Sequence, residues 1–440
     1  MIRLKFFLAA FIALGLSGFS QGADNEPPAG FVALFNGKDL AGWHGYDTKD
    51  PRKFQEMSAE DQQAAREKSL EDIKKHWTIQ GADLVNDGNG LYLTTDKNYG
   101  DYELWIDYKT VPKADSGIYL KGVPQVQIWD FTDPSKFGLG ADKGSGGLWN
   151  NSAGKPGKDP LVLADKPLGE WNRFHIIQIG ARTTVYLNDK LVVNNAILEN
   201  YFDRSQPLLP RGPIQLQTHG GEIRWKNIFV REIPLEEATA KLQAAADKEG
   251  FKSLFNGTDL TGWAGAADNY EVVDGAIRCK AGKGGVLHTK DEYSDFVVRL
   301  EFKVPPGGNN GLAIRYPGQG DTAYVGMCEL QVLDNEAPQY AKLDKRQYHG
   351  SAYGMAAAAR GYQRPAGQWN YQEVTVKGST ITVELNGSII LNTDLSKITE
   401  YMANSPHPGK DRTQGFFGFA GHGDAVSFRN VQIKALEAAK

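Results

Sequence analysis

The sequence predicts an all-β protein that contains two tandem antiparallel β-sandwiches of the jelly-roll type, joined by a short helical linker. Three observations predict this fold. The chain repeats itself, because ten residues that begin at Leu34 recur with eight identities at Leu254. Apolar and polar residues alternate along several segments. The 50 glycines among 440 residues follow no collagen-like period and indicate many tight turns.

Composition narrows the class of protein. At about 150 residues per domain, the length predicts two or three domains. Hydrophobic residues make up 41% and charged residues 23% of the chain, which is ordinary for a globular protein and excludes long disordered regions. The formal net charge is −4 and no basic stripe is present, so we expect no nucleic-acid partner.

The N-terminus is typical of a secretory signal peptide. Two basic residues, Arg3 and Lys5, precede eleven mostly apolar residues, and small and polar residues follow up to Ala23. Eleven residues are too few to cross a bilayer, which needs about 20. We therefore predict a signal peptide over 1–22, export to the periplasm or beyond, and no membrane span after cleavage.

The repeat defines the domains. GEWN at Gly169 corresponds to GQWN at Gly367, in addition to the motifs above. We place the first sandwich at 30–233 and the second at 250–436. A charged segment at about 47–76 has no counterpart in the second copy and predicts an inserted helix. Residues 234–249 are rich in Ala, Glu and Lys, which favours a helical linker.

Local patterns within each copy predict strands. In TITVELNGSIIL, Ile381, Val383 and Leu385 alternate with polar residues, and Asn386-Gly387 suits a two-residue hairpin turn. The segments 102–109 and 296–303 have the same period of two. Antiparallel sheets can keep one face for the core and leave the other for a ligand.

One segment in each copy places polar residues on the same strand face. In CELQVLD of the second copy, Glu329 and Gln331 share a face, Asp334 ends the strand and Arg315 lies nearby in sequence. In PQVQIWD of the first copy the matching residues are Gln125, Gln127, Trp129 and Asp130, with Lys121 in place of Arg315. These faces predict either a sugar-binding groove or an ordinary solvent-facing surface.

Two further features are candidates for a site. Glycine-rich loops carry Trp149 in the first copy and Tyr353 in the second, where each ring could stack on a sugar or simply form a turn. His219 and His422 occupy the same place in the two copies, and Asp424 lies beside His422. Each imidazole predicts either a functional group or a structural one.

Several common chemistries have no sequence support. No GxSxG, HExxH or Walker motif is present. The position of Glu329 is a glutamine in the first copy, so the carboxylate pair of an ordinary glycosidase is not evident in both halves. Cys279 and Cys328 either form a disulfide, which an exported protein allows, or remain buried thiols.

Taken together, LFNGxDLxGW, PQVQIWD, CELQVLD, GSGGLWNN, GEWN and the RWKNIFVREI ending resemble the 3-keto-disaccharide hydrolase domain family along nearly all of both copies. The resemblance implies a concanavalin A-like jelly roll. It also implies a secreted carbohydrate-active protein that cleaves glycosides already oxidised at C3 of the sugar. In such a substrate the ketone acidifies the C2 hydrogen, so one base and one oxyanion stabiliser suffice for elimination, followed by hydration.

Under that resemblance the second copy would act as follows. His349 or His422 is the base, and Arg315 holds the enolate. Hydroxyls or a metal would be held by Glu329, Gln331 and Asp334, with Tyr353 and Asp424 also binding substrate. The chemistry allows a divalent metal, although no ligand set is certain.

The first copy would supply polar contacts from Asp115, Gln125, Gln127, Asp130 and His219, with stacking surfaces from Trp129 and Trp149. Lys143 is predicted to stand where the second copy has His349. If His349 is the base, the first copy is inactive. The alternatives are a non-catalytic, lectin-like tandem module and a structural scaffold, since jelly rolls often bind sugars without turning them over.

Overall fold

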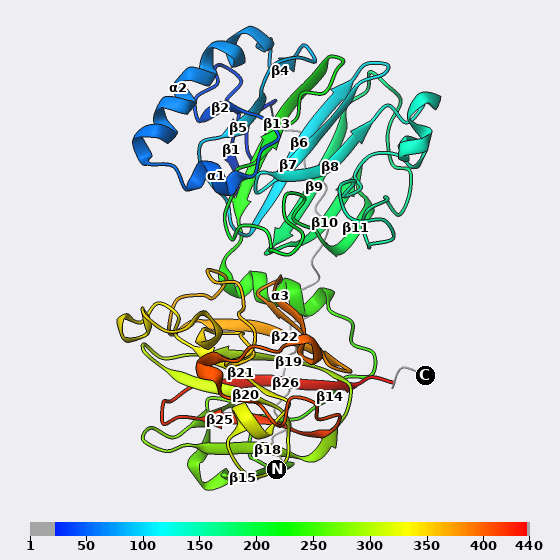
Figure 1. Cartoon of the computed structure of the whole chain (residues 1–440). Coiled ribbons are helices and arrows are strands. Elements are labelled where there is room, and N and C mark those ends of the chain that lie inside the picture. Colours follow the sequence, from blue (N-terminus) through cyan, green and yellow to red (C-terminus); the bar gives the residue numbers. More distant parts are fainter. Residues whose placement is uncertain (1–22, 438–440) are drawn as a thin grey trace, which may run out of the picture.

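The structure is a computed structural model that describes residues 23–437. The predicted signal peptide, 1–22, and residues 438–440 lie outside the described residues. Figure 1 shows two β-sandwiches, one above the other, with helix α3 (Leu235–Ala245) between them. The prediction of an all-β chain with two tandem antiparallel sandwiches and a helical linker is confirmed. Within the described residues, no helix is both long and apolar enough to cross a membrane.

The first sandwich has an eight-stranded sheet and a five-stranded sheet, both antiparallel. The large sheet has the order β11-β10-β9-β6-β13-β4-β3, and β1 also pairs with β13. The small sheet has the order β2-β5-β12-β7-β8. The strands of the large sheet are β1 (Val32–Ala33), β3 (Trp77–Gln80), β4 (Asp83–Asn86), β6 (Tyr102–Thr110), β9 (Asn172–Ile179), β10 (Arg182–Leu187), β11 (Lys190–Ile197) and β13 (Ile223–Glu232). Those of the small sheet are β2 (Trp43–Tyr46), β5 (Tyr92–Thr95), β7 (Asp115–Leu120), β8 (Val123–Trp129) and β12 (Gln215–Leu216).

The second sandwich repeats this topology. Its large sheet has the order β16-β17-β26-β19-β22-β23-β24, with β14 on β26, and its small sheet has the order β15-β18-β25-β20-β21. The large-sheet strands are β14 (Lys252–Ser253), β16 (Tyr270–Val273), β17 (Ala276–Cys279), β19 (Phe296–Lys303), β22 (Trp369–Lys377), β23 (Thr380–Leu385), β24 (Ser388–Asp394) and β26 (Ser427–Ala435). The small-sheet strands are β15 (Trp263–Gly265), β18 (Gly285–Tyr293), β20 (Asn309–Tyr316), β21 (Cys328–Leu333) and β25 (Gly415–Gly421).

Each core lies between the two sheets of its own sandwich. On β23, Ile381, Val383 and Leu385 point inward and are at most 1% exposed, which is the alternation that the sequence predicts. Cys279 and Cys328 are buried in the second core as free thiols, and this settles the choice between a disulfide and two thiols. Burial raises the pKa of both.

The inserted segment of the first copy forms two helices, α1 (Pro51–Gln55) and α2 (Ala59–His76). Ser58 caps α2 by accepting a hydrogen bond from the Asp61 amide, and three basic residues end the helix, which suits its dipole. Gly45 of β2 donates its amide to Ser69 of α2. The helices therefore cover the edge strand β2, as the blue segment in Figure 1 shows.

Polar contacts join the two sandwiches around the linker. The Arg182 guanidinium binds the Glu384 carboxylate through two hydrogen bonds of 2.8 and 2.6 Å. The Ala181 amide donates to the Gly387 carbonyl, at the β23–β24 turn. Arg364 donates to Thr239 of α3 at 2.7 Å. The two domains are thus held together both by direct contacts and by a contact through α3.

Candidate functional site

The outer face of each small sheet carries the polar side chains that the sequence singled out. Along β21, Leu330 and Val332 point into the core, so Glu329 and Gln331 point to the opposite face. Neighbouring β20 pairs with β21 so that Gly311 lies opposite Gln331. The same face of the sheet continues onto β25, after which the chain reaches His422.

An imidazole–carboxylate pair forms the centre of this face in the second domain. The Nε2 atom of His422 lies 3.4 Å from Oε1 of Glu329. The carboxylate side chain is only 5% exposed, whereas the imidazole is 45% exposed. The hydrogen bond to Glu329 raises the pKa of His422, and the charges of Asp321 and Asp424 act in the same direction. The pair therefore consists of an exposed imidazole base, His422, and a nearly buried carboxylate, Glu329, that orients it.

A glycine on β20 makes this pair possible. A Cβ atom on Gly311 would lie 2.3 Å from Oε1 of Glu329. The Glu329 side chain therefore crosses directly over the backbone of β20 to reach His422. Any other residue at position 311 would push the carboxylate away from the imidazole.

Asn309 connects the remaining polar groups, although the sequence analysis did not select it. Its side-chain oxygen accepts a hydrogen bond from Nε2 of Gln331 at 2.8 Å, and its backbone amide donates one to the Asp424 carboxylate at 3.0 Å. Gln331 and Asp424 are thus held beside Glu329 and His422. Aligning the two copies would have found Asn309, because it corresponds to Asp115 of the first copy.

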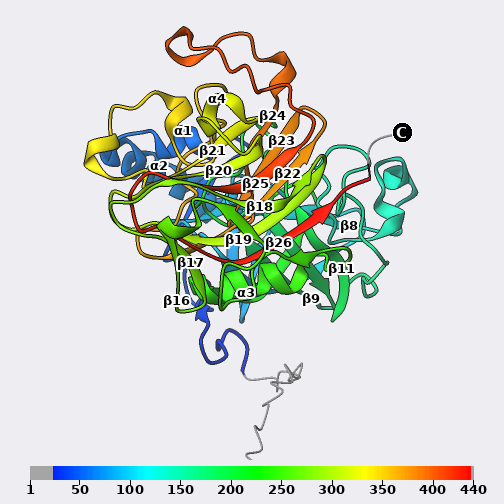
Figure 2. The same cartoon turned by 90° about the horizontal axis from the view of Figure 1, so that it is seen from below.

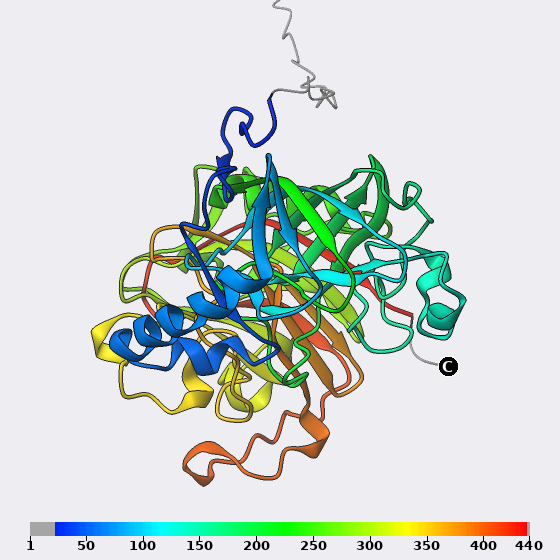
Figure 3. The same ribbon diagram turned by 90° about the horizontal axis from the view of Figure 1, so that it is seen from above.

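Two tyrosines lie near Glu329, since the Tyr353 backbone bonds to it and its charge acts on Tyr324. The Tyr353 amide donates to the Glu329 carbonyl, and Nε2 of Gln347 donates to the Tyr353 hydroxyl at 3.0 Å, which leaves the phenol proton free. Tyr324 lies on helix α4 (Thr322–Val325) and stacks on His407 with ring centroids 4.8 Å apart. His407 belongs to the loop 398–413, the orange excursion in Figures 2 and 3.

The first domain has a corresponding pair with a different acid. Nδ1 of His219 lies 3.1 Å from Oδ2 of Asp115, whose side chain is 8% exposed. Gln127 donates to the other Asp115 oxygen at 2.8 Å, and Gln125 donates to Gln127. Lys136, which the sequence analysis did not select, also reaches Asp115, at 3.2 Å. The hydrogen bond to Asp115 raises the pKa of His219.

Two tryptophans lie near this first-domain pair. Trp129 is 5% exposed and Trp149 is partly exposed, and their rings make an edge contact with centroids 5.9 Å apart. Nε1 of Trp149 donates to the Leu139 carbonyl. The predicted residues Asp115, Gln125, Gln127, Trp129, Trp149 and His219 therefore gather in one region.

Arg315 does not belong to the second-domain site. It is 1% exposed and donates to the carbonyls of Ser294, Gly378 and Arg412. Its counterpart Lys121 donates to the equivalent carbonyl, that of Gly180. Both cations therefore have the same structural role, namely satisfying buried carbonyl groups, and the enolate-binding role expected for Arg315 is withdrawn.

His349 is also placed away from the site. It is 1% exposed, lies 3.0 Å from Gln372 of the opposite sheet and stacks on Phe302. Burial lowers its pKa to about 4. Because a substrate cannot reach it, His349 is withdrawn as the base. The matching backbone bonds of Gly146 and Gly350 also show that Ser145, and not Lys143, corresponds to His349.

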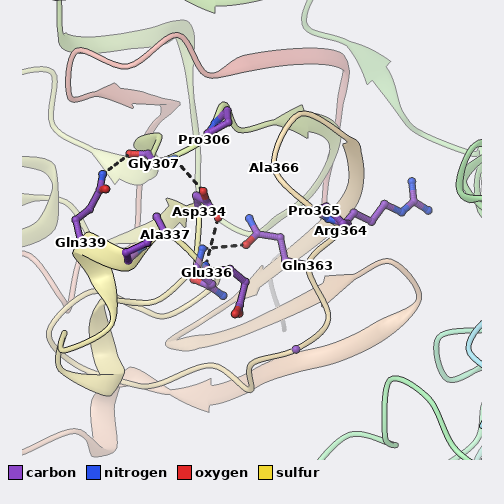
Figure 4. Close-up of a pocket in the computed structure, with 13 residues that line it drawn as sticks. Pro306, Gly307, Asp334, Glu336, Ala337, Gln339, Gln363, Arg364, Pro365 and Ala366 are labelled. Carbon is purple, nitrogen blue, oxygen red and sulfur yellow. Dashed lines mark hydrogen bonds between the residues drawn. The ribbon is translucent and has the colours of Figure 1, made fainter.

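Asp334 and Asp130 stabilise turns through hydrogen bonds with backbone amides and do not line the imidazole–carboxylate pairs. Asp334 accepts from the Gly307 amide at 2.8 Å, and Asp130 accepts from the equivalent Lys113 amide at 2.7 Å. Asp334 does border a pocket of about 510 Å³, which Figure 4 shows with Gln339 bonded to Gly307 and Arg364 directed away. Its own oxygens are used by the backbone, so it is not assigned a chemical role.

No metal centre is evident in the part of the chain that the structure describes. There, no group of three or more His, Cys, Asp and Glu side chains could hold an ion.

Comparison with known proteins identifies the family. A model of the 3-keto-alpha-glucoside-1,2-lyase-like domain matches residues 30–231 and again residues 250–434. The chain belongs to this family. The family resemblance that the sequence motifs suggested is thereby confirmed, and it covers both sandwiches.

Named relatives of this family member share between a quarter and a third of their aligned residues with it. A 3-keto-disaccharide hydrolase of Bacteroides thetaiotaomicron is 28% identical over 239 residues, which cover 44% of this chain and 82% of that protein. Two crystal structures of putative glycosyl hydrolases from Parabacteroides distasonis are 27% and 25% identical, each with a TM-score of 0.39. They cover 42% and 47% of this chain and 99% of their own chains.

Proposed function

We propose that this protein is an exported enzyme that cleaves 3-keto-glycosides in its second domain, with His422 as the base. The exposed His422 imidazole on the nearly buried Glu329 carboxylate carries this proposal. Membership of the family supports the substrate class, and the name of the Bacteroides relative points to the same chemistry. The apolar segment that starts the chain supports export.

The geometry suits removal of a proton from carbon. A carboxylate only accepts hydrogen bonds, so the neutral imidazole carries its proton on Nε2, towards Glu329. Its Nδ1 lone pair is then free to accept the C2 proton of the sugar. Glu329 stabilises the imidazolium that forms, as an orienting acid does beside other catalytic histidines.

The bond changes balance without an added oxidant. The C2–H electron pair moves into the C2–C3 bond and the ketone oxygen becomes an enolate, which the free phenol proton of Tyr353 is proposed to stabilise. The enolate then re-forms the ketone and expels the aglycone from C1, and the imidazolium returns its proton to the departing oxygen. Water later adds across the C1–C2 double bond, so the net reaction is hydrolysis.

Isotope labelling tests this route directly. The full chain is incubated in D2O with a disaccharide oxidised at C3, with and without a chelator, and the products are analysed by NMR. We expect release of the second sugar and deuterium at C2 of the 3-keto product. Release without deuterium at C2 would contradict the proton abstraction. Binding without any product would instead support a lectin-like module.

A further inference from the structure

We propose that the first domain carries a separate binding site for an acidic sugar, one whose ring bears a carboxylate. The site is formed by Lys136 and His219 above Asp115, beside Trp149. It uses no residue of the second-domain pair and requires no cleavage. It therefore goes beyond the proposed reaction.

Two cationic groups meet a single carboxylate at this position. Lys136 Nζ and His219 Nδ1 lie 3.2 and 3.1 Å from the same Asp115 oxygen. The second oxygen of Asp115 accepts a hydrogen bond from Gln127. Asp115 lies beneath the other groups, because the imidazole is 54% exposed and the lysine side chain 32% exposed, against 8% for the carboxylate.

The cluster therefore presents positive charge to the solvent. With His219 protonated, the ammonium and the imidazolium outnumber the one carboxylate between them. The Asp115 hydrogen bond favours that protonated form. An anionic group that approaches Lys136 and His219 can accept a charge-assisted hydrogen bond from each of them.

The neighbouring aromatic rings favour a sugar over a small anion. The Lys136 ammonium lies 5.9 Å from the centre of the Trp129 ring, which fixes the cation beside the tryptophan pair. Trp149 is partly exposed and its indole nitrogen is bonded to the Leu139 carbonyl, so the ring is held in place. Aromatic faces suit the C–H surface of a sugar ring.

The second domain lacks these features. Leu333 and Tyr340 stand where the first domain has Trp129 and Lys136, and Tyr340 donates its hydroxyl to the Gly307 carbonyl. The charges that act on His422 are all acidic. The two faces therefore differ in the sign of their local charge, and an acidic sugar is expected to prefer the first domain.

Calorimetric titration of the full chain tests the proposal. Glucuronate, glucose and acetate are compared, none of which is a 3-keto-glycoside, so the result does not depend on whether the enzyme proposal holds. We expect glucuronate to bind at least about tenfold more tightly than either of the others, since it alone combines a sugar ring with a carboxylate that can accept charge-assisted hydrogen bonds. The affinity should fall as salt is added.

Variants locate the site. Lys136→Met and His219→Gln should each weaken glucuronate binding by about tenfold, whereas Lys166→Met, which removes an exposed lysine bonded to the Trp171 carbonyl, should not. Equal affinity for glucose and glucuronate would overturn the acidic specificity. Equal affinity for acetate and glucuronate would overturn the sugar component. If a variant fails to fold, the salt dependence of the wild-type chain still decides whether charge drives binding.

Discussion

The two copies keep an imidazole–carboxylate pair in the same place but take the carboxylate from different strands. In the second domain the acid is Glu329 on β21, and β20 offers the neutral Asn309. In the first domain the acid is Asp115 on β7, and β8 offers the neutral Gln125. Of these two positions, one is a carboxylate and the other an amide in each copy, and the histidine contacts the carboxylate. The histidine is thus the same in both copies, whereas the residue type and the strand of its acidic partner differ.

The surroundings of the two pairs differ as well. In the first domain, Phe54 of α1 stacks on His44 with centroids 5.5 Å apart and meets Tyr46 edge-on, so the inserted helices cover part of the sheet face. In the second domain this insertion is absent. There, the loop 398–413 packs on α4, where His407 stacks on Tyr324. A shared fold can therefore present two different faces, as the two different ligands proposed above require.

The largest expected effect separates the two imidazoles by catalysis. His422→Gln should lower the rate of 3-keto-glycoside cleavage by about 10²- to 10⁴-fold, because the general base is lost. His76→Gln is the matched control. His76 also contacts a carboxylate, with Nδ1 3.0 Å from Oδ2 of Asp87, but it ends helix α2 of the first domain. Steady-state kinetics on the full chain measure both variants, and similar rates for the two would exclude His422 as the base.

The next prediction concerns the buried cations that correspond between copies. Arg315→Met should destabilise the second domain by about 3–5 kcal/mol, because it breaks a buried ion pair with Asp295. Lys121→Met should cost less, about 1–3 kcal/mol, because it leaves one carbonyl unsatisfied. Calorimetric unfolding gives both values. If the Arg315→Met chain keeps its stability but loses activity, the structural role is contradicted and Arg315 acts in the site.

Removing the second-domain carboxylate should change the pH profile. Glu329→Gln is expected to lower cleavage by about tenfold or more, through loss of a charged hydrogen bond. The bond raises the pKa of His422, and the base must be neutral, so activity rises with pH through that raised value. The variant should therefore shift the midpoint to lower pH, which a pH–rate profile measures.

The same pKa shift has a consequence for stability. Because the folded-state pKa of His422 is raised, the pair stabilises the fold below the unfolded-state value near 6.5 and loses this contribution as pH rises through the folded-state value. In Glu329→Gln that pH dependence of stability should be reduced.

For the rate prediction above, an unchanged midpoint of the pH–rate profile in Glu329→Gln would contradict the role of Glu329.

The smallest effect is expected from moving the charge between strands. Asn309→Asp combined with Glu329→Gln copies the first-domain arrangement into the second domain. The new carboxylate keeps the bond from Gln331 and is expected to contact His422. NMR titration of His422 should show a pKa closer to wild type than in Glu329→Gln alone. If the single and double variants titrate alike, the position of the acid matters more than its charge.

Particular residues show how far sequence reasoning reached. Alternation along CELQVL placed Glu329 and Gln331 on the outer face, because a strand has a period of two. The repeat paired His219 with His422. Neither pattern located His349 or Arg315 correctly, since a residue in a loop or at a strand end has no periodicity that tells core from surface. Lys136 was missed because its 3₁₀ turn, Pro134–Leu139, folds back onto the sheet.

The sequence alone determined the duplication, the β-sandwich class and the family, because these depend on local alternation and on motifs that recur within one chain. Only the tertiary structure decided which polar groups meet. The reason is physical. A contact such as that between Glu329 and His422 joins residues 93 positions apart, and it depends on sheet register and on the bare backbone of Gly311, neither of which is encoded in the spacing of the residues.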